Sequence, residues 1–125
     1  MAACVTHFEI YGEEPAKLAE FYRVVLGWQL DKAPGVDYWR IQTDSLNGGL
    51  TYRPLAALRN WLNYVNVDSL DAALAQAVKM GAEVLREKTA VPKTAWYAIL
   101  ADPAGNAFGL WQSDPNAFPP PEPNE

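Results

Sequence analysis

A histidine and a glutamate two residues apart are the clearest chemical pair in this sequence. His7, the only histidine of the chain, and Glu9 lie in a segment in which apolar and polar side chains alternate, as in a β-strand. The alternation places His7, Glu9 and Tyr11 on one face, and it turns the side chains between them toward the core. An imidazole and a carboxylate on one face can bind a divalent metal ion or act as a general base. A histidine that only forms a hydrogen bond with a neighbouring side chain is the equally simple alternative.

The elements that must position this pair are a strand, a helix and three further strands. Residues 15–26 are predicted to be helical, because Gly27 follows a set of apolar side chains at helical spacing, namely Leu18, Phe21, Tyr22, Val25 and Leu26. Pro34-Gly35 and Asn47-Gly48 are predicted to be turns. The strand-like segments are residues 5–11, 28–32, 36–43 and 49–53.

The second half of the chain repeats this order. Ser69 is a plausible N-cap for a helix that runs to Met80-Gly81, with Leu70, Ala73, Leu74, Ala77 and Val78 at helical spacing. A turn is predicted at residues 102–106. The strand-like segments are residues 61–67, 83–87, 96–100 and 107–112. Strand, helix and three strands therefore occur twice, which indicates an α+β fold built by structural duplication, with modules at about residues 5–54 and 61–112.

Length, composition and charge exclude several classes of function. A chain of 125 residues with 50% hydrophobic and 20% charged residues is typical of one globular domain, here residues 1–114. Ten basic against 15 acidic residues, with no basic stretch, make nucleic acid and anionic membranes poor partners. The single cysteine, Cys4, excludes an intramolecular disulfide and a cysteine-rich zinc site. No apolar run is long enough to span a bilayer, so a cytoplasmic location is expected. The proline-rich residues 115–125 are expected to be extended or disordered.

Four segments carry a resemblance to a known family. They are Val5-Thr6-His7-Phe8, the stretch from Ala19-Glu20-Phe21-Tyr22 to Leu26-Gly27-Trp28, the run Val67-Asp68-Ser69-Leu70-Asp71-Ala72-Ala73, and residues 100–112 with the turn Asp102-Pro103-Ala104-Gly105-Asn106. Together and in this order they resemble the vicinal oxygen chelate superfamily, which includes glyoxalase I, bleomycin-resistance proteins and extradiol dioxygenases. The resemblance implies that the two βαβββ modules pair in one domain and form a curved sheet with a central cleft. It also implies a homodimer, and a divalent metal held in the cleft by His and Glu side chains.

The positions of the implied metal ligands depart from the family pattern. His7 stands where the first ligand is expected. Leu62 occupies the position of a His or Gln in the second module, and Gly109 occupies that of the closing Glu. In the first module the corresponding position falls near Gly48, Gly49 and Thr51. Since a tight metal site needs three or four converging ligands, the sequence predicts that no metal or other cofactor is bound.

Alternation along the strands predicts which side chains line the cleft. The residues are His7, Glu9 and Tyr11 from the first strand, Leu62, Tyr64 and Asn66 from the fifth, and Gly109 and Trp111 from the last. A floor that is aromatic with few polar groups suits a small, partly apolar organic ligand, for which Gly109 would leave room. Most of the other tryptophans are expected in the core, and Arg40 and Lys93 are expected in solvent.

Three hypotheses for function remain open on this sequence. The first is a protein that binds a small organic molecule without a metal, similar to the drug-sequestering members of the superfamily. The second is a metal-dependent lyase or dioxygenase that uses His7 and Glu9 as catalytic or metal-binding residues. The third is a non-catalytic interaction domain whose cleft is filled by its own side chains. Covalent catalysis is disfavoured, since Cys4 and Ser113 have no base at motif spacing.

Overall fold

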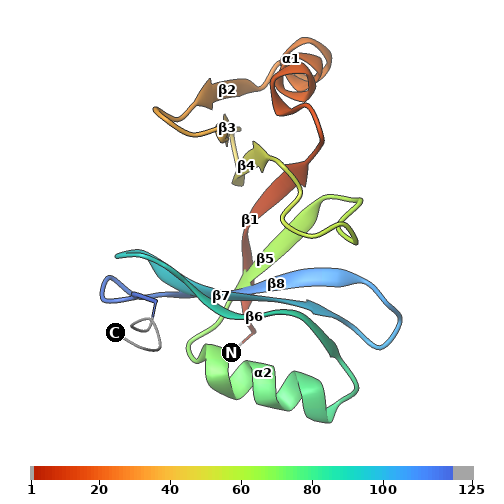
Figure 1. Cartoon of the computed structure of the whole chain (residues 1–125), viewed down its shortest axis with the longest axis vertical. Helices are drawn as coiled ribbons and strands as arrows, with labels where there is room; N and C mark the ends of the chain where they lie inside the picture. Colours follow the sequence, from red (N-terminus) through yellow and green to blue (C-terminus); the bar gives the residue numbers. More distant parts are fainter. Residues whose placement is uncertain (1, 120–125) are drawn as a thin grey trace, which may run out of the picture. The chain divides into compact units, whose positions relative to one another are not determined.

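The computed structural model describes residues 2–119, which form two helices and eight strands in the order βαβββ, repeated once (Figure 1). The elements are β1 (Cys4–Tyr11), α1 (Pro15–Leu26), β2 (Gln29–Lys32), β3 (Trp39–Gln42), β4 (Asn47–Thr51), β5 (Leu62–Asn66), α2 (Leu70–Lys79), β6 (Glu83–Val91), β7 (Ala95–Ala101) and β8 (Ala107–Ser113). The predicted α+β class and the duplicated βαβββ order are confirmed. Within residues 2–119, neither helix is long and apolar enough to cross a membrane.

The chain divides into two compact units. The first module comprises residues 6–63, and the second comprises residues 64–119 together with residues 2–5. The strand order is β2-β3-β4-β1 in the first module and β5-β8-β7-β6 in the second. In both, the first strand pairs in parallel with the last strand, whereas the remaining pairs are antiparallel. The duplication predicted from the sequence is therefore present in the strand topology.

The core of the first module lies between α1 and one face of its sheet. Phe8 and Ile10 of β1 are buried there with Ala19 of α1, as their alternation predicts. The helix begins at Pro15, which the first turn tolerates because its backbone nitrogen needs no partner there. It ends at Gly27, whose left-handed φ of 69° suits a residue without a side chain and whose N–H donates to the Arg23 carbonyl at 3.0 Å.

Only some of the apolar side chains predicted to form the buried face of α1 are in fact buried. Leu18 and Tyr22 pack against the core, and Ala19 is fully buried. Three of the side chains predicted for the same stripe are exposed instead, namely Phe21, Val25 and Leu26. A helix on a small four-stranded sheet buries only the residues directly over it, so an apolar side chain one step around the helix stays at the surface.

The core of the second module lies between α2 and the β8-β7-β6 strands (Figure 1). Leu70 of α2 packs there with Ala98, Leu100 and Leu110, and Trp96 packs against them. The predicted N-cap is confirmed, because the Ser69 hydroxyl accepts a hydrogen bond from the Ala72 N–H at 3.1 Å.

The Asp-Pro-Ala-Gly-Asn segment is the tight turn between β7 and β8. Asp102 Oδ1 accepts hydrogen bonds from the N–H groups of Ala104 and Asn106, each at 2.9 Å, and Gly105 has a φ of 90°. The Asn106 N–H, above all, holds the pKa of Asp102 below its usual value. This motif therefore serves the fold, since it closes the hairpin and sets the register of β8.

One turn prediction and one strand prediction need correction. Asn47 and Gly48 belong to β4, and the turn lies before them, where the Asn47 side chain accepts a hydrogen bond from the Thr43 N–H at 3.1 Å. The strand predicted from residue 36 begins only at Trp39. The Ala33 N–H donates to the Tyr38 carbonyl at 2.8 Å, which closes a loop around the correctly predicted Pro34-Gly35 turn and keeps residues 36–38 out of the strand.

The proline-rich segment is partly anchored. Ala117 is fully buried, and its carbonyl accepts a hydrogen bond from the Lys93 N–H at 2.8 Å at the tip of the β6–β7 hairpin. Ala117 thus joins the start of this segment, which is expected to be extended or disordered, to the second module. Residues 120–125 lie outside the described part of the chain.

Candidate functional site

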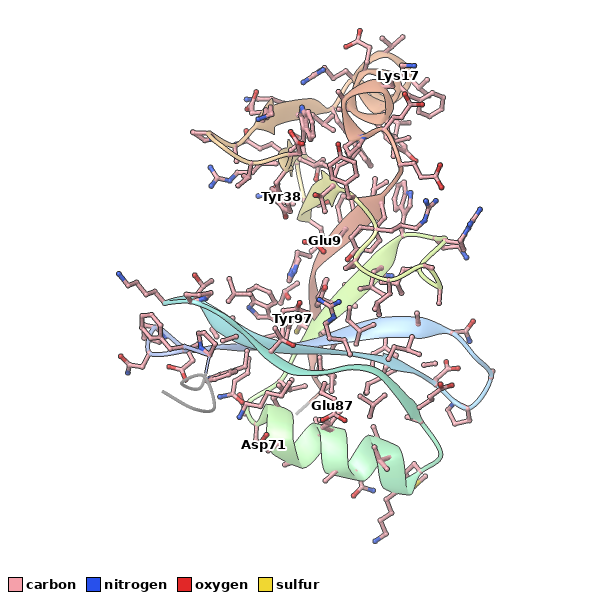
Figure 2. The ribbon with its side chains drawn as sticks, viewed as in Figure 1. Glu9, Lys17, Tyr38, Asp71, Glu87 and Tyr97 are labelled. Carbon is pink, nitrogen blue, oxygen red and sulfur yellow. The ribbon has the colours of Figure 1, made fainter. Side chains whose placement is uncertain are left out.

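Glu9 is the centre of a polar cluster on the face of the first module that points away from α1. The Tyr11 hydroxyl donates to Glu9 Oε1 at 2.6 Å, and the Tyr38 hydroxyl donates to Oε2 at 3.2 Å. Figure 2 labels Glu9 and Tyr38 in the first module. Tyr11 comes from the same strand two residues on, and Tyr38 comes from the residue before β3. Each oxygen of the carboxylate thus has a phenol donor, and the three residues are called the Glu9 cluster below.

The Tyr38 phenol is a permanent donor in this cluster. Its burial, followed by the negative charge of Glu9 and the hydrogen bond to it, raises the pKa of Tyr38 far above its usual value of 10.0. All of these effects disfavour the phenolate. Tyr38 therefore keeps its proton at any physiological pH and orients the Glu9 carboxylate as a fixed acceptor.

A glycine creates the space that Tyr38 fills. Gly49 of β4 is the register partner of Glu9 on β1 and of Arg40 on β3. A Cβ atom at Gly49 would overlap the Tyr38 hydroxyl and the ring carbon that bears it. Any side chain at this position would therefore push the phenol away from Glu9.

His7 lies two residues before Glu9 on the same strand and is half-buried. Its Nδ1 is 3.4 Å from the Thr6 hydroxyl. Burial lowers the pKa of His7 from its usual value of 6.5, because the imidazolium loses solvation. At neutral pH the ring is therefore an uncharged donor and acceptor.

Three aromatic residues form a cluster on the second module, on the face of the sheet opposite α2. The Tyr64 ring lies 5.9 Å from the Trp111 ring and 6.2 Å from the Tyr97 ring, in both cases edge to face. Register explains the grouping, since Tyr97 pairs with Trp111 and Tyr64 with Gly109. Arg86 of β6 donates to the Tyr97 hydroxyl at 3.2 Å. We call Tyr64, Tyr97 and Trp111 the aromatic cluster.

The Tyr64 ring fills the space beside Gly109. A Cβ atom at Gly109 would overlap the Tyr64 ring. The expectation that this glycine leaves space for a ligand is therefore corrected, because the space holds a side chain of the same module. The arrangement matches that of the first module, where Gly49 stands on the last strand and Tyr38 covers it.

The residues at the implied metal-ligand positions do not fit a metal ion held in the family's manner. Gly48, Gly49 and Gly109 have no side-chain donor atom, and tyrosine side chains cover Gly49 and Gly109. Leu62 is buried and has none either. The Thr51 hydroxyl donates to the Asp37 carbonyl at 2.7 Å. Within residues 2–119, no three His, Cys, Asp or Glu side chains converge into a potential metal site. For the alternative that uses His7 and Glu9, both Glu9 oxygens already accept hydrogen bonds from tyrosines.

The structure brings together some predicted site residues and adds others. Five of the predicted site residues are in contact in two groups, one in each module. The first group is Glu9 with Tyr11, and the second is Tyr64 with Gly109 and Trp111. Asn66 is half-buried and lines a pocket of about 410 Å³ beside the start of α2. Three residues were not predicted, namely Tyr38, Tyr97 and Arg86. Alternation on its strand would have placed Tyr97 with Trp111, whereas Tyr38 requires knowledge of the strand pairing.

The family of the chain follows from its sequence. Residues 9–111 match the sequence model of the family described as the glyoxalase-like domain. The chain belongs to this family. The membership confirms the resemblance to the vicinal oxygen chelate superfamily, and it covers both βαβββ modules.

Two curated relatives have the printed name "Putative glyoxylase CFP32". The protein from Mycobacterium tuberculosis (strain CDC 1551 / Oshkosh) is 30% identical over 112 residues, which cover 86% of this chain and 43% of that protein. The protein from Mycobacterium bovis matches to the same extent. This glyoxalase-like chain thus spans less than half the length of the curated relatives it matches.

Solved structures agree in fold. A glyoxalase/bleomycin resistance protein/dioxygenase superfamily member from Vibrio splendidus 12B01 has a TM-score of 0.65 at 14% identity, with 90% of this chain and 100% of that chain covered. A single-residue variant of Streptomyces coelicolor methylmalonyl-CoA epimerase, in complex with 2-nitronate-propionyl-CoA, has a TM-score of 0.61 at 17% identity, with 95% of this chain and 100% of that chain covered. At such identities the likeness concerns the fold and not the activity.

Proposed function

We propose that this glyoxalase-like protein binds a small, partly apolar organic molecule without a resident metal ion. One observation carries the proposal. Gly109, at the position where the superfamily's closing carboxylate is expected, is covered by Tyr64, and Gly49, one of the residues near the corresponding position of the first module, is covered by Tyr38. Tyrosines that fill these positions favour stacking and hydrogen bonding over coordination chemistry.

The two faces suggest the chemistry of the ligand. The aromatic cluster offers ring edges and faces to a planar or apolar group. The Glu9 cluster offers an oriented carboxylate and two phenols, which suit a ligand group that donates hydrogen bonds. His7 adds an uncharged imidazole on the same face as Glu9. We therefore expect a planar or apolar ligand group at the aromatic cluster, and a neutral or cationic hydrogen-bond donor group at the Glu9 cluster.

The names of the relatives support the family and leave the activity open. The mycobacterial relatives are named as glyoxylases, but this chain spans 43% of their length. Catalysis by this chain would require groups that activate a substrate, and the chemistry at the expected ligand positions does not favour the metal-dependent lyase or dioxygenase alternative. Saturable binding without turnover is the expected behaviour.

A fluorescence screen in excess EDTA tests the proposal. Fragment-sized aromatic amines, phenols and heterocycles are titrated while tryptophan emission is recorded. A ligand at the aromatic cluster should quench Trp111, and replacing this tryptophan with phenylalanine should weaken binding about fivefold and remove most of the quenching.

Trp96→Phe is the matched control for Trp111→Phe. Trp96 belongs to the same module but packs with α2 on the other face of the sheet. The control should keep both the affinity and the quenching. The proposal fails if no compound binds in EDTA while binding appears on addition of a divalent metal, or if both tryptophan variants behave alike.

We further propose that the protein is a homodimer. The exposed apolar patch of α1 supports this proposal, since Val24, Val25 and Leu26 are 73%, 58% and 47% exposed. Three adjacent apolar side chains at a helix end, each close to half exposed or more, are typical of a surface that another subunit covers.

A further inference from the structure

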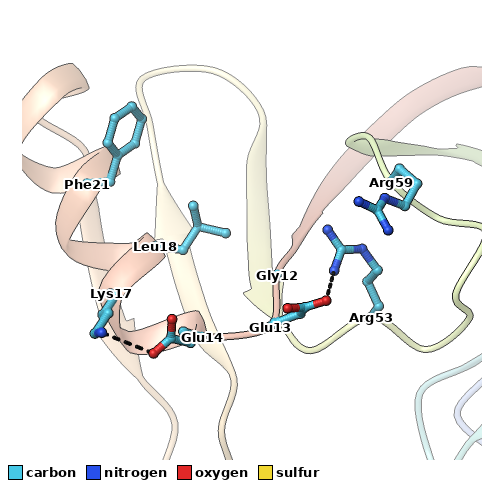
Figure 3. A pocket seen from close by; sticks show the side chains of 8 residues that line it. All are labelled: Gly12, Glu13, Glu14, Lys17, Leu18, Phe21, Arg53 and Arg59. Carbon is cyan, nitrogen blue, oxygen red and sulfur yellow. Dashed lines mark ion pairs between the residues drawn. The ribbon is translucent and has the colours of Figure 1, made fainter.

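The first module contains a pocket that the proposed function does not use. It has a volume of about 430 Å³ and lies between the start of α1 and the loop after β4 (Figure 3). None of its residues belongs to the Glu9 cluster or to the aromatic cluster. It is lined by Gly12, Glu13, Glu14, Lys17, Leu18, Phe21, Arg53 and Arg59.

Arg53 is held in place at the loop side of this pocket. Its Nε donates to the Leu58 carbonyl at 3.0 Å, and the Leu58 side chain is buried, so the loop is anchored. Arg53 Nη1 lies 3.6 Å from Glu13 Oε1, which is an ion pair longer than a hydrogen bond. With a side chain only 20% exposed, Arg53 presents a guanidinium that loses little freedom when it binds an anion.

Arg59 brings a second guanidinium to the same pocket. Within the part of the chain that the structure describes, its side chain makes no hydrogen bond or ion pair, in contrast to Arg53. Lys17 on the helix side is already paired with Glu14 at 3.1 Å (Figure 3). The two guanidiniums therefore have one carboxylate close to them, that of Glu13, which pairs with Arg53, in a chain whose net charge is -5. The excess positive charge here favours an anion.

The helix side of the pocket is apolar. Leu18 and Phe21, one turn apart on α1, form this wall, and Figure 3 shows them across the pocket from the two arginines. Phe21 is 52% exposed, so its ring can still be covered by an occupant. A ligand that reaches from the arginines to this wall must have a charged end and an apolar end.

We propose that this pocket binds a small amphipathic monocarboxylate. Its carboxylate would pair with Arg53 and Arg59, for which the planar guanidinium has matching geometry, and its alkyl or aryl part would lie against Leu18 and Phe21. The carboxylates of Glu13, beside Arg53, and of Glu14, on the helix side of the pocket, disfavour a doubly charged group such as a phosphate. The site is separate in its residues from those of the proposed function.

Titration with 4-phenylbutyrate, followed by two-dimensional ¹H–¹⁵N NMR of the whole chain, tests this site. The expected result is saturable shifts confined to residues 12–21 and 53–59. Arg59→Gln should raise the dissociation constant about tenfold, and Phe21→Ala about fivefold. Arg59 is exposed and Phe21 half-exposed, so both variants should keep the dispersed spectrum of the folded protein.

Two controls make the test decisive. The uncharged analogue 4-phenylbutanamide should bind at least about tenfold more weakly than the acid, because it lacks the charge. Lys79→Gln, which removes a cation at the end of α2 in the other module, should leave the affinity unchanged. The proposal is overturned if the acid and the amide bind with equal affinity, or if Arg59→Gln and Lys79→Gln lose affinity for the acid to the same extent. It is also overturned if the shifts occur at Tyr64 and Trp111 and not at the pocket. Failure here would leave the EDTA screen for the proposed function unaffected.

Discussion

At two positions in this protein, the absence of one side chain makes room for another. Gly49 admits the phenol of Tyr38, and Gly109 admits the ring of Tyr64. Each glycine lies on the last strand of its module, where the superfamily resemblance implies a metal-binding residue. A tyrosine fills the space beside each of these glycines, and neither glycine has a side-chain donor atom for a metal ion.

Gly109→Ala tests the close contact with Tyr64. The added methyl group has no room, so the free energy of unfolding should fall by about 1–3 kcal/mol in urea denaturation. In a Tyr64→Ala background the same change should cost less than about 0.5 kcal/mol, because the ring is gone. Equal costs in the two backgrounds would contradict the packing described here.

His7 should make stability depend on pH. Burial lowers its pKa in the folded state below the usual value of 6.5, so the unfolded chain binds the proton first as the pH falls. Stability is therefore present above pH 6.5 and is lost as the pH falls toward the folded-state pKa. When the pH is lowered from about 7 to about 5, the free energy of unfolding should therefore fall by less in His7→Gln than in the parent protein.

Urea denaturation at several pH values measures this difference. Because all other titrating groups are common to both proteins, their contributions cancel in the comparison. A pH profile of His7→Gln that runs parallel to that of the parent would show that burial of the imidazole has no cost.

At the scale of the elements, local signals account for most of what the sequence predicts. The helix of residues 15–26 has the predicted bounds, since Pro15 and the left-handed Gly27 are local signals. The Asn47-Gly48 prediction failed because the Asn47 side chain closes the preceding turn with Thr43, an arrangement that a dipeptide signal does not reveal. Tyr38 was missed because its contact with Glu9 spans 29 positions in sequence and depends on strand pairing.

Ser69→Ala is expected to weaken α2. The Ser69 hydroxyl is the acceptor for the Ala72 N–H, and the loss of such a cap costs about 1 kcal/mol. Ser69→Asp, which restores an acceptor at the positive end of the helix, should recover the parent stability. Thermal unfolding of the three proteins checks this order, and a Ser69→Asp variant as unstable as Ser69→Ala would contradict the capping role.

At the scale of the whole molecule, the order of four short segments was enough to predict the family. The residues of the site could be predicted only in part. The strand faces of Glu9 and Trp111 follow from alternation, which is a property of the chain itself. What occupies the space at Gly109 depends on the register between β5 and β8, so the sequence suggested a ligand where the structure has Tyr64.

The dimer proposal predicts a mass of twice 13.8 kDa in light scattering coupled to gel filtration. Val24→Asp places a charge in the exposed patch of α1 and should shift the protein to the monomer mass. Val78→Asp is the matched control, because Val78 is an exposed valine on α2, and it should leave the dimer intact. A parent protein of monomer mass, or dissociation by the control variant as well, would contradict the proposal.

Metal content is the most direct test of the central claim that the protein has no resident metal site. The protein is stripped with EDTA, dialysed in turn against nickel, zinc, manganese and ferrous iron, freed of unbound metal, and analysed by inductively coupled plasma mass spectrometry. The account predicts that less than about a tenth of the chains retain any of these metals, because one histidine and a tyrosine-bound carboxylate fall short of a tight donor set. Retention of close to one metal ion per chain would contradict it.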